Sequence, residues 1–162
     1  MLALDVDGVL TDGGIIVHDN GSESKKFHVQ DGAWIVIWRR LGLKTAIISG
    51  RHCGAVAHRA KELKIDYCYQ NCHHKLEYLD KLVEVSGIPL EQTAYIGDDV
   101  ADIPILRRVG FAAAVADALP QVKQAAHFTT TRAGGRGAVQ EVIAHLLTRM
   151  GLMELALERY YQ

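Results

Sequence analysis

The chain has 162 residues, of which 49% are apolar, so its length suits one domain with a substantial buried core. Its 18 Lys and Arg nearly balance its 19 Asp and Glu, which argues against a general nucleic-acid-binding or membrane-surface protein. The three cysteines are an odd count without a disulfide framework and fit a reducing compartment, so we expect residues 1–162 to form a single domain inside the cell.

Short apolar runs alternate with helical patterns along the chain. Strands are predicted at residues 2–4, 45–48, 67–69, 94–96 and 111–115. Helices are predicted at about 33–41, 55–63 and 75–85, after residue 99, and around 139–147. This alternation predicts an α/β fold with a three-layer, Rossmann-like parallel sheet.

The two ends and one insertion interrupt this pattern. The first run has no basic leader, so we interpret it as a buried strand and not as a signal peptide, and its abrupt start predicts a short natural extension before it. Residues 15–17 and 26–29 flank Asn20-Gly21, which is a strong hairpin turn signal. We therefore predict a projecting β-hairpin at about 14–29. Residues from about 152 to 162 are expected to form a short helix or a loose tail.

Polar residues follow four of the predicted strands. Because parallel strands present their carboxyl ends at one edge of the sheet, we expect these residues to lie together. They are Asp5, Asp7 and Gly8; Ser49, Gly50 and Arg51; Lys75; and Asp98, Asp99 and Asp102.

These residue types suit phosphoryl transfer from an anionic ester. A carboxylate such as Asp5 can act as a nucleophile and divide hydrolysis into two steps through an acyl phosphate. Because a carboxylate and a phosphate repel each other, a divalent cation must bridge them, and Asp5 and Asp98 offer the hard oxygens that Mg²⁺ prefers. Asp7 is placed to protonate the leaving alcohol and then to activate water.

The remaining residues offer contacts to the substrate. Ser49 and Lys75 can hold phosphate oxygens, and Gly8 and Gly50 let backbone N–H groups approach closely. Arg51 can grip a substrate carboxylate through two hydrogen bonds.

In order and content, the motifs DVDGVLTD, SGR, a lone Lys and GDDVAD resemble those of the haloacid dehalogenase superfamily of phosphatases, over residues 5–102. The resemblance implies that Asp5 is the nucleophile, that Asp7 is the general acid/base, and that Ser49 and Lys75 bind phosphate. It also implies Mg²⁺ held by the nucleophile, by the backbone carbonyl of the acid/base and by an Asp of the last motif. We assign that Asp to position 98, keep Asp99 open as the alternative, and give Asp102 a supporting role.

A narrower resemblance covers almost the whole chain. KFHVQDG at 26–32, AVADA at 114–118 and RAGGRGAVQE at 132–141 are similar to the family of 3-deoxy-D-manno-octulosonate 8-phosphate phosphatases. That family is cytoplasmic and tetrameric and acts in lipopolysaccharide precursor synthesis. Its hairpins meet at the centre of the tetramer, and neighbouring subunits help to close each site. Arg51 resembles this family more than a sister family that acts on a nine-carbon sugar acid phosphate.

The motif spacing leaves no room for a sizeable cap domain. Only 36 residues separate Asp12 from Ser49, and 22 separate Lys75 from Asp98. Because a small-molecule phosphatase benefits from excluding water, we expect a capless chain whose site a neighbouring subunit completes.

Other functions remain alternatives. A signalling receiver domain also places a phosphorylated Asp, Mg²⁺, a hydroxyl and a Lys at strand ends, but it lacks a general acid at the position of Asp7. A catalytically silent domain would be expected to lose a key residue, and none is missing here. Among phosphatases, the nine-carbon keto-deoxy sugar acid phosphate stays open as the substrate.

Overall fold

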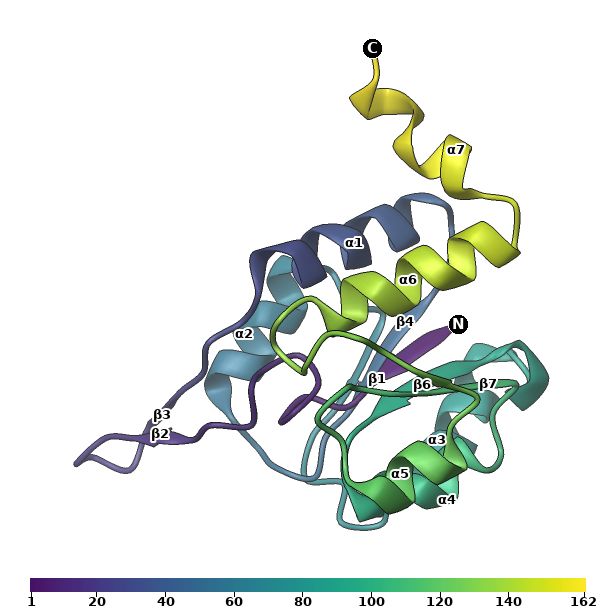
Figure 1. The fold of residues 1–162 in the computed structure, drawn as a ribbon. Coiled ribbons are helices and arrows are strands. Elements are labelled where there is room, and N and C mark those ends of the chain that lie inside the picture. The colour runs from purple at the N-terminus through teal and green to yellow at the C-terminus, as the bar shows by residue number, and fades with distance from the viewer.

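The computed structural model describes residues 1–162 and is built on a six-stranded sheet in the order β5-β4-β1-β6-β7-β8 (Figure 1). Every neighbouring pair of these strands is parallel, which confirms the predicted α/β sheet. β1 lies inside the sheet, between β4 and β6, so the residues that follow it have neighbours on both sides. The strands are β1 (Leu2–Leu4), β4 (Thr45–Ile48), β5 (Tyr67–Tyr69), β6 (Ala94–Gly97), β7 (Phe111–Ala114) and β8 (Phe128–Thr129).

The central strands are apolar on both faces. Every residue of β1, β4 and β6 is buried, as expected where helices cover both faces of a parallel sheet. β8 was not predicted, because its two residues, one of them exposed, carry no periodic signal.

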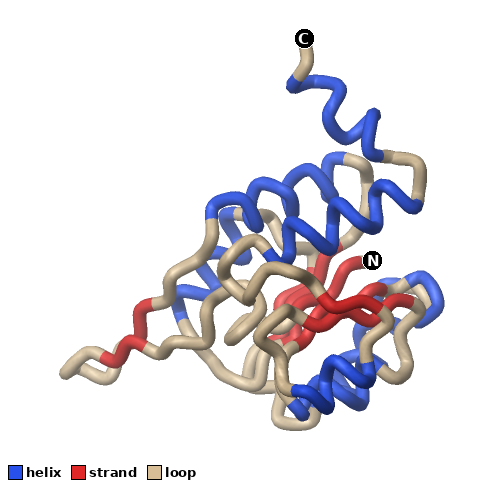
Figure 2. The backbone as a smooth tube through the Cα atoms, in the orientation of Figure 1, coloured by secondary structure: helices blue, strands red, loops and turns tan.

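Helices form the outer two layers (Figures 1 and 2). One face carries α1 (Val29–Arg40), α2 (Gly54–Glu62) and α6 (Ala138–Arg149), and the other carries α3 (Lys75–Ser86), α4 (Ile103–Leu106) and α5 (Pro120–Ala125). Three short 3₁₀ turns complete the chain: η1 (Leu90–Gln92), η2 (Val100–Asp102) and η3 (Glu158–Tyr160). One cluster of buried apolar side chains extends from Met1 to Ala156, so the sheet and both helix layers share a core. No helix here combines the length and the apolar character needed to span a lipid bilayer.

A two-stranded antiparallel hairpin projects from the sheet, as predicted (Figure 1). It consists of β2 (Ile16–Val17) and β3 (Glu23–Ser24), with Val17 paired to Glu23. The predicted second strand at 26–29 is wrong. The N–H groups of Gly21 and His18 donate to the carbonyls of His18 and Ser22, so the chain turns back at once and pairs immediately after residue 22. Val29 already belongs to α1, which begins earlier than the predicted residue 33.

The C-terminal residues form a short helix, which is one of the two expected outcomes for this segment. α7 (Met153–Leu157) follows α6 after a turn and continues into η3. Both lie at the end of the molecule away from the hairpin (Figure 1).

Candidate active site

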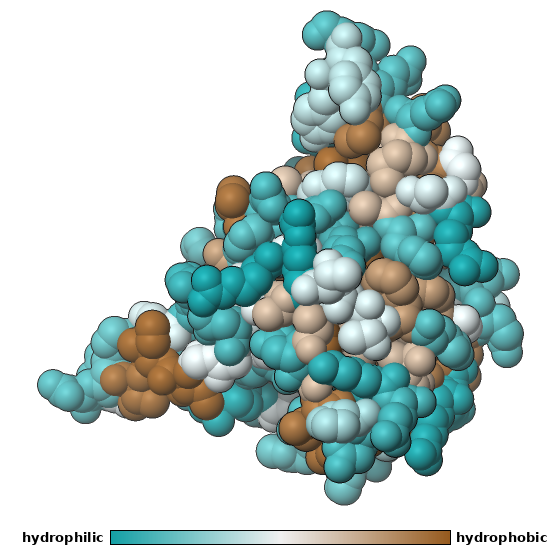
Figure 3. All heavy atoms as spheres, in the orientation of Figure 1, coloured by the Kyte–Doolittle hydropathy of each residue, from teal (hydrophilic) through white to brown (hydrophobic).

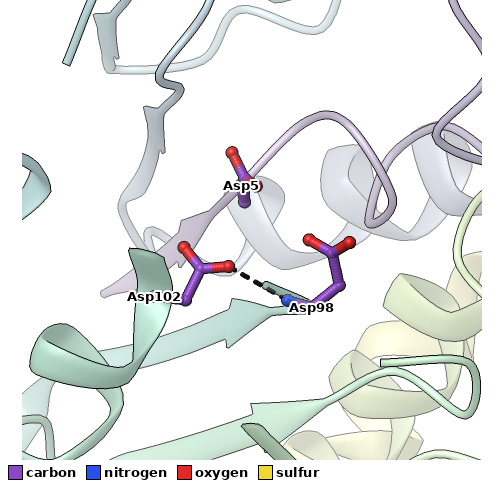
Figure 4. A group of neighbouring side chains, drawn as sticks. All are labelled: Asp5, Asp98 and Asp102. Carbon is purple, nitrogen blue, oxygen red and sulfur yellow. Dashed lines mark hydrogen bonds between the residues drawn. The ribbon is translucent and has the colours of Figure 1, made fainter. Parts of the chain in front are cut away.

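The carboxyl ends of the central strands bring the predicted residues together. Asp5 follows β1, Ser49 follows β4, Asp98 follows β6, and Lys75 begins α3. Because β1 is paired with both β4 and β6, these strand ends are adjacent. Asp5, Asp98 and Asp102 each offer a carboxylate oxygen, and these oxygens lie within 4.8 Å of one another (Figure 4).

Asp5 and Lys75 form a buried ion pair. The Nζ of Lys75 lies 3.0 Å from Oδ1 of Asp5. Burial and the charge of Asp102 raise the pKa of Asp5 to about 7, although Lys75 acts in the opposite direction. Burial alone would lower the pKa of Lys75, but the charges of Asp5 and Asp102 outweigh it and the net shift is upward. Lys75 is therefore a cation held directly against Asp5.

Asp102 is fully occupied by the protein. Its Oδ1 accepts hydrogen bonds from Lys75 Nζ and from the Tyr95 hydroxyl, both at 2.7 Å. Its Oδ2 accepts from the backbone N–H groups of Asp98 and Asp99, at 3.0 and 3.2 Å. Asp102 thus orients Lys75 and the turn after β6. Sequence reasoning missed Tyr95, because a tyrosine in an apolar strand carries no signal that separates it from an ordinary core residue.

Asp98, unlike Asp102, has a carboxylate oxygen that no group of the protein binds. Its buried Oδ1 has no hydrogen-bond partner, and burial together with the charges of Asp5 and Asp102 raises its pKa to about 8. A buried carboxylate without donors is costly, and a divalent cation between Asp98 and Asp5 would satisfy it. Asp99 is exposed, and its Oδ1 accepts from the N–H of Val100 at 2.7 Å. Asp5 and Asp98 therefore fit a hard divalent ion, whereas Asp99 is not among the carboxylates gathered there.

The loop after β1 is tightly wound around one carbonyl group. The N–H groups of Val9, Leu10 and Thr11 all donate to the carbonyl of Val6. Gly8 has a φ of +88°, and a Cβ at this position would lie 2.0 Å from Oδ2 of Asp98. Glycine is thus required here for a reason beyond the predicted approach of its N–H to a ligand.

Ser49 combines a fixed backbone with an unengaged hydroxyl. Its N–H donates to the carbonyl of Tyr69 at 3.0 Å, and its carbonyl accepts from the N–H of Cys72 at 2.9 Å. The buried side chain takes part in none of the protein's side-chain hydrogen bonds, so the hydroxyl remains available to a ligand. Gly50 follows it, and a Cβ there would make only an ordinary contact at 3.8 Å with the Cys72 carbonyl oxygen.

Asp7 and Arg51 lie where the site meets the base of the hairpin. The Lys25 ammonium forms an ion pair with Oδ1 of Asp7, and Arg51 donates to Glu23. The Nε of Arg51 lies 4.0 Å from Oδ2 of Asp7. Sequence reasoning missed Lys25 and Glu23, since their place beside Asp7 depends on a hairpin register that residue type does not reveal.

The glycine-rich segment before α6 supports the loop after β1. The N–H of Gly135 donates to the carbonyl of Val9 at 2.9 Å. The N–H of Gly134 donates to Asp117 at 2.9 Å, and a Cβ at Gly134 would lie 1.7 Å from the Gly8 carbonyl oxygen. Backbone contacts therefore hold this segment directly against the candidate site.

The chain resembles known proteins along most of its length. Residues 68–143 match the family model described as haloacid dehalogenase-like hydrolase. The chain is 43% identical over 156 residues to the 3-deoxy-D-manno-octulosonate 8-phosphate phosphatase KdsC of Escherichia coli K12, covering 96% of this chain and 83% of that protein.

Solved structures give the same picture. The 3-deoxy-D-manno-octulosonate 8-phosphate phosphatase of Moraxella catarrhalis, in complex with a magnesium ion, a phosphate ion and a KDO molecule, matches with a TM-score of 0.95 and 39% identity, covering 99% of this chain and 92% of that one. The phosphatase of the same name from Yersinia pestis matches with a TM-score of 0.92 and 40% identity, over 94% of this chain and 83% of that one.

Proposed function

This chain belongs to the haloacid dehalogenase-like hydrolases, in the family of the 3-deoxy-D-manno-octulosonate 8-phosphate phosphatases, and we propose that it hydrolyses that phosphate ester to the free sugar acid and phosphate. The observation that carries the proposal is the set formed by the buried Asp5 and Lys75 and the half-buried Asp98 at the carboxyl edge of the sheet. It joins a nucleophile, a cation and an unsatisfied carboxylate, as phosphoryl transfer requires. As a member of this family, the chain is a phosphoric monoester hydrolase.

In the first step, a carboxylate oxygen of Asp5 attacks phosphorus. A bond forms between Asp5 and phosphorus while the bond from phosphorus to the sugar oxygen breaks, and Asp7 gives its proton to that oxygen. In the second step, water attacks the phospho-aspartate and gives a proton to the Asp7 carboxylate. Phosphate leaves, and Asp5 and protonated Asp7 are restored.

Two neighbours of Asp5 suit binding of the transferred phosphoryl group. Lys75, 3.0 Å from Asp5, can pair with a phosphate oxygen without leaving Asp102, which orients it. Ser49 contributes its unengaged hydroxyl, and Gly50 beside it can offer a backbone N–H. Arg51 at the rim suits the substrate carboxylate.

The cofactor is Mg²⁺, and we propose that Asp5, Asp98 and the backbone carbonyl of Asp7 hold it. The bound ion supplies the positive charge that lets a carboxylate approach an anionic ester. The unsatisfied Oδ1 of Asp98 supports this ligand set. The magnesium ion in the M. catarrhalis structure supports Mg²⁺ as the cofactor. Asp102 serves as the orienting residue, with Asp99 outside the ligand set.

We further propose a tetramer in which the hairpin carries the subunit contact. Ile15, Ile16 and Val17 are 46%, 53% and 65% exposed and form a hydrophobic patch on the projecting arm (Figure 3). Arg51 and Asp7 lie at the base of this arm, so a subunit packed there would cover the rim of the site. We also propose that the enzyme acts in the cytoplasm, in lipopolysaccharide precursor synthesis. The family resemblance supports the pathway and the location, and the three free cysteines fit a reducing compartment.

The test is phosphate release from a panel of sugar phosphates, with Mg²⁺ and with EDTA. The panel includes the eight-carbon and the nine-carbon keto-deoxy acid phosphates. We expect Mg²⁺-dependent preference for the eight-carbon acid in the wild type and in Asp80→Asn, which removes an exposed carboxylate on α3. Preference for the nine-carbon acid would reassign the substrate. If the folded protein releases phosphate from none of the esters, a receiver-like or catalytically silent domain becomes the better interpretation.

A further inference from the structure

The hairpin delivers two charged side chains to the rim of the site. Lys25 follows β3, and its side chain is 0% exposed. Its ammonium contacts Oδ1 of Asp7 and lies 3.9 Å from Oε2 of Glu23. Glu23 accepts a hydrogen bond from Arg51, whose Nε lies 4.0 Å from Oδ2 of Asp7. Two acidic and two basic side chains thus form one cluster at the rim of the site.

A fully buried ammonium group determines the position of its partner. Removing a lysine from water costs several kcal/mol unless a carboxylate compensates it closely. Asp7 is the only side chain that accepts a hydrogen bond from Lys25, and Glu23 is the only other carboxylate within ion-pair distance. Lys25 therefore fixes Oδ1 of an Asp7 carboxylate that is itself 20% exposed.

The two oxygens of Asp7 consequently differ. Oδ1 is held by Lys25, whereas Oδ2 takes part in no side-chain hydrogen bond, with Arg51 only at ion-pair distance. An oxygen without a donor is the one that can carry and transfer a proton. The hairpin thus leaves one defined oxygen of Asp7 for chemistry.

We propose that Lys25 is a positioning residue for Asp7, through which the hairpin sets the geometry of proton transfer to the leaving alcohol. This inference rests on the proposed function, in which Asp7 is the general acid. Glu23 on β3 forms ion pairs with both Lys25 and Arg51. The same residue therefore helps to position Asp7, through Lys25, and Arg51, the predicted substrate-binding residue.

A positioning role predicts a loss that depends on the leaving group. An alkoxide needs a proton to depart, whereas p-nitrophenolate leaves without one. Lys25→Met keeps an unbranched side chain one atom shorter than lysine and removes its charge. We expect kcat/KM for an alkyl phosphate to fall about 10- to 100-fold, less than the full usual contribution of acid–base catalysis because Asp7 itself remains, and kcat/KM for p-nitrophenyl phosphate to change less than about threefold.

The controls use neighbouring residues. Lys26→Met removes the adjacent lysine, which is 69% exposed and 3.7 Å from Asp12, and is expected to leave both rates unchanged. Asp7→Asn should show the same leaving-group dependence as Lys25→Met. Far-UV circular dichroism and thermal melting establish that each variant is folded. If Lys25→Met does not fold, Glu23→Gln is measured instead, with a smaller loss expected and again only for the alkyl ester.

The outcomes separate this inference from the proposed function. Equal losses for both esters in folded Lys25→Met, or no loss for either, overturn the positioning role. If Asp7→Asn shows leaving-group dependence and Lys25→Met does not, only the inference about Lys25 fails. If the wild type does not hydrolyse the eight-carbon acid phosphate, the proposed substrate is wrong. The role of Lys25 is then tested with hexose 6-phosphate or with another alkyl phosphate that the enzyme hydrolyses.

Discussion

Gly8 and Asp98, from two different strand ends, approach so closely that a Cβ on Gly8 would lie 2.0 Å from the Asp98 carboxylate. No side chain can occupy that space unless Asp98 moves. The φ of +88° at Gly8 also disfavours any residue with a side chain. The position of Asp98, the proposed metal ligand after β6, therefore depends on the absence of a side chain at Gly8 in the loop after β1.

Gly8→Ala is expected to displace Asp98 and to weaken Mg²⁺ binding, so that the Mg²⁺ concentration for half-maximal activity rises at least about tenfold. Titration of activity with Mg²⁺ measures this. Gly42→Ala is the matched control, because Gly42 has a φ of +78° and a Cβ there would meet nothing within 4 Å. The same rise in Gly42→Ala would show that backbone strain, and not the contact with Asp98, is responsible.

Stability should depend on Mg²⁺ more strongly at higher pH. Burial raises the pKa of Asp5 to about 7 and that of Asp98 to about 8, in each case helped by neighbouring carboxylates. The folded chain thus binds more protons than the unfolded chain between about pH 4 and about pH 8, and these groups lower its stability as the pH rises through this window.

In EDTA, we therefore expect these groups to lower the melting temperature between about pH 5 and about pH 8. This decrease should be smaller in Asp98→Asn. Added Mg²⁺ should raise the melting temperature most near pH 8, where both carboxylates are charged. Asp80→Asn serves as the control and should behave as the wild type. A Mg²⁺-induced shift that is the same at both ends of the window would contradict this account.

Asp31 of α1 caps the start of α6, which lies far along the chain. Its Oδ1 and Oδ2 accept from the N–H groups of Gln140 and Gly137, at 2.8 and 3.2 Å. Asp31→Ala leaves these donors without an acceptor and is expected to lower the free energy of unfolding by about 1–2 kcal/mol. Asp31→Asn keeps one acceptor oxygen and should lose less. Denaturant titration compares the two, and equal losses would argue against capping.

Much of this architecture follows from local patterns. β1, β4 and β6 are buried, mainly apolar runs that end at polar motifs, and parallel strands necessarily collect those motifs at one edge. Asp5, Ser49, Lys75 and Asp98 were therefore predictable as neighbours before the structure was known.

What the sequence did not predict depends on tertiary geometry. The strand of the hairpin at Glu23–Ser24 follows from where the turn closes, and the contact of Lys25 with Asp7 depends on that register. Asp98 has a buried Oδ1 without a hydrogen-bond partner, whereas Asp99 is exposed and accepts from the N–H of Val100. Residue type alone does not show this difference.

The hairpin offers a direct test of the proposed assembly. Val17→Lys places a charge on an apolar side chain that is 65% exposed, and it should dissociate the tetramer into monomers of reduced activity. Size-exclusion chromatography with light scattering measures the mass. Val85→Lys makes the same change on α3, at a side chain 52% exposed, and should leave the assembly intact. A fully active monomer would contradict closure of the site by a neighbouring subunit.

The central claim is that Asp5 carries the phosphoryl group during turnover. Rapid quenching of the enzyme with the eight-carbon acid phosphate and Mg²⁺, followed by peptide mass spectrometry, tests it most directly. We predict one phosphoryl adduct on the peptide that contains Asp5 in the wild type, and none in Asp5→Asn. An adduct on another residue, or full turnover by Asp5→Asn, would contradict the mechanism.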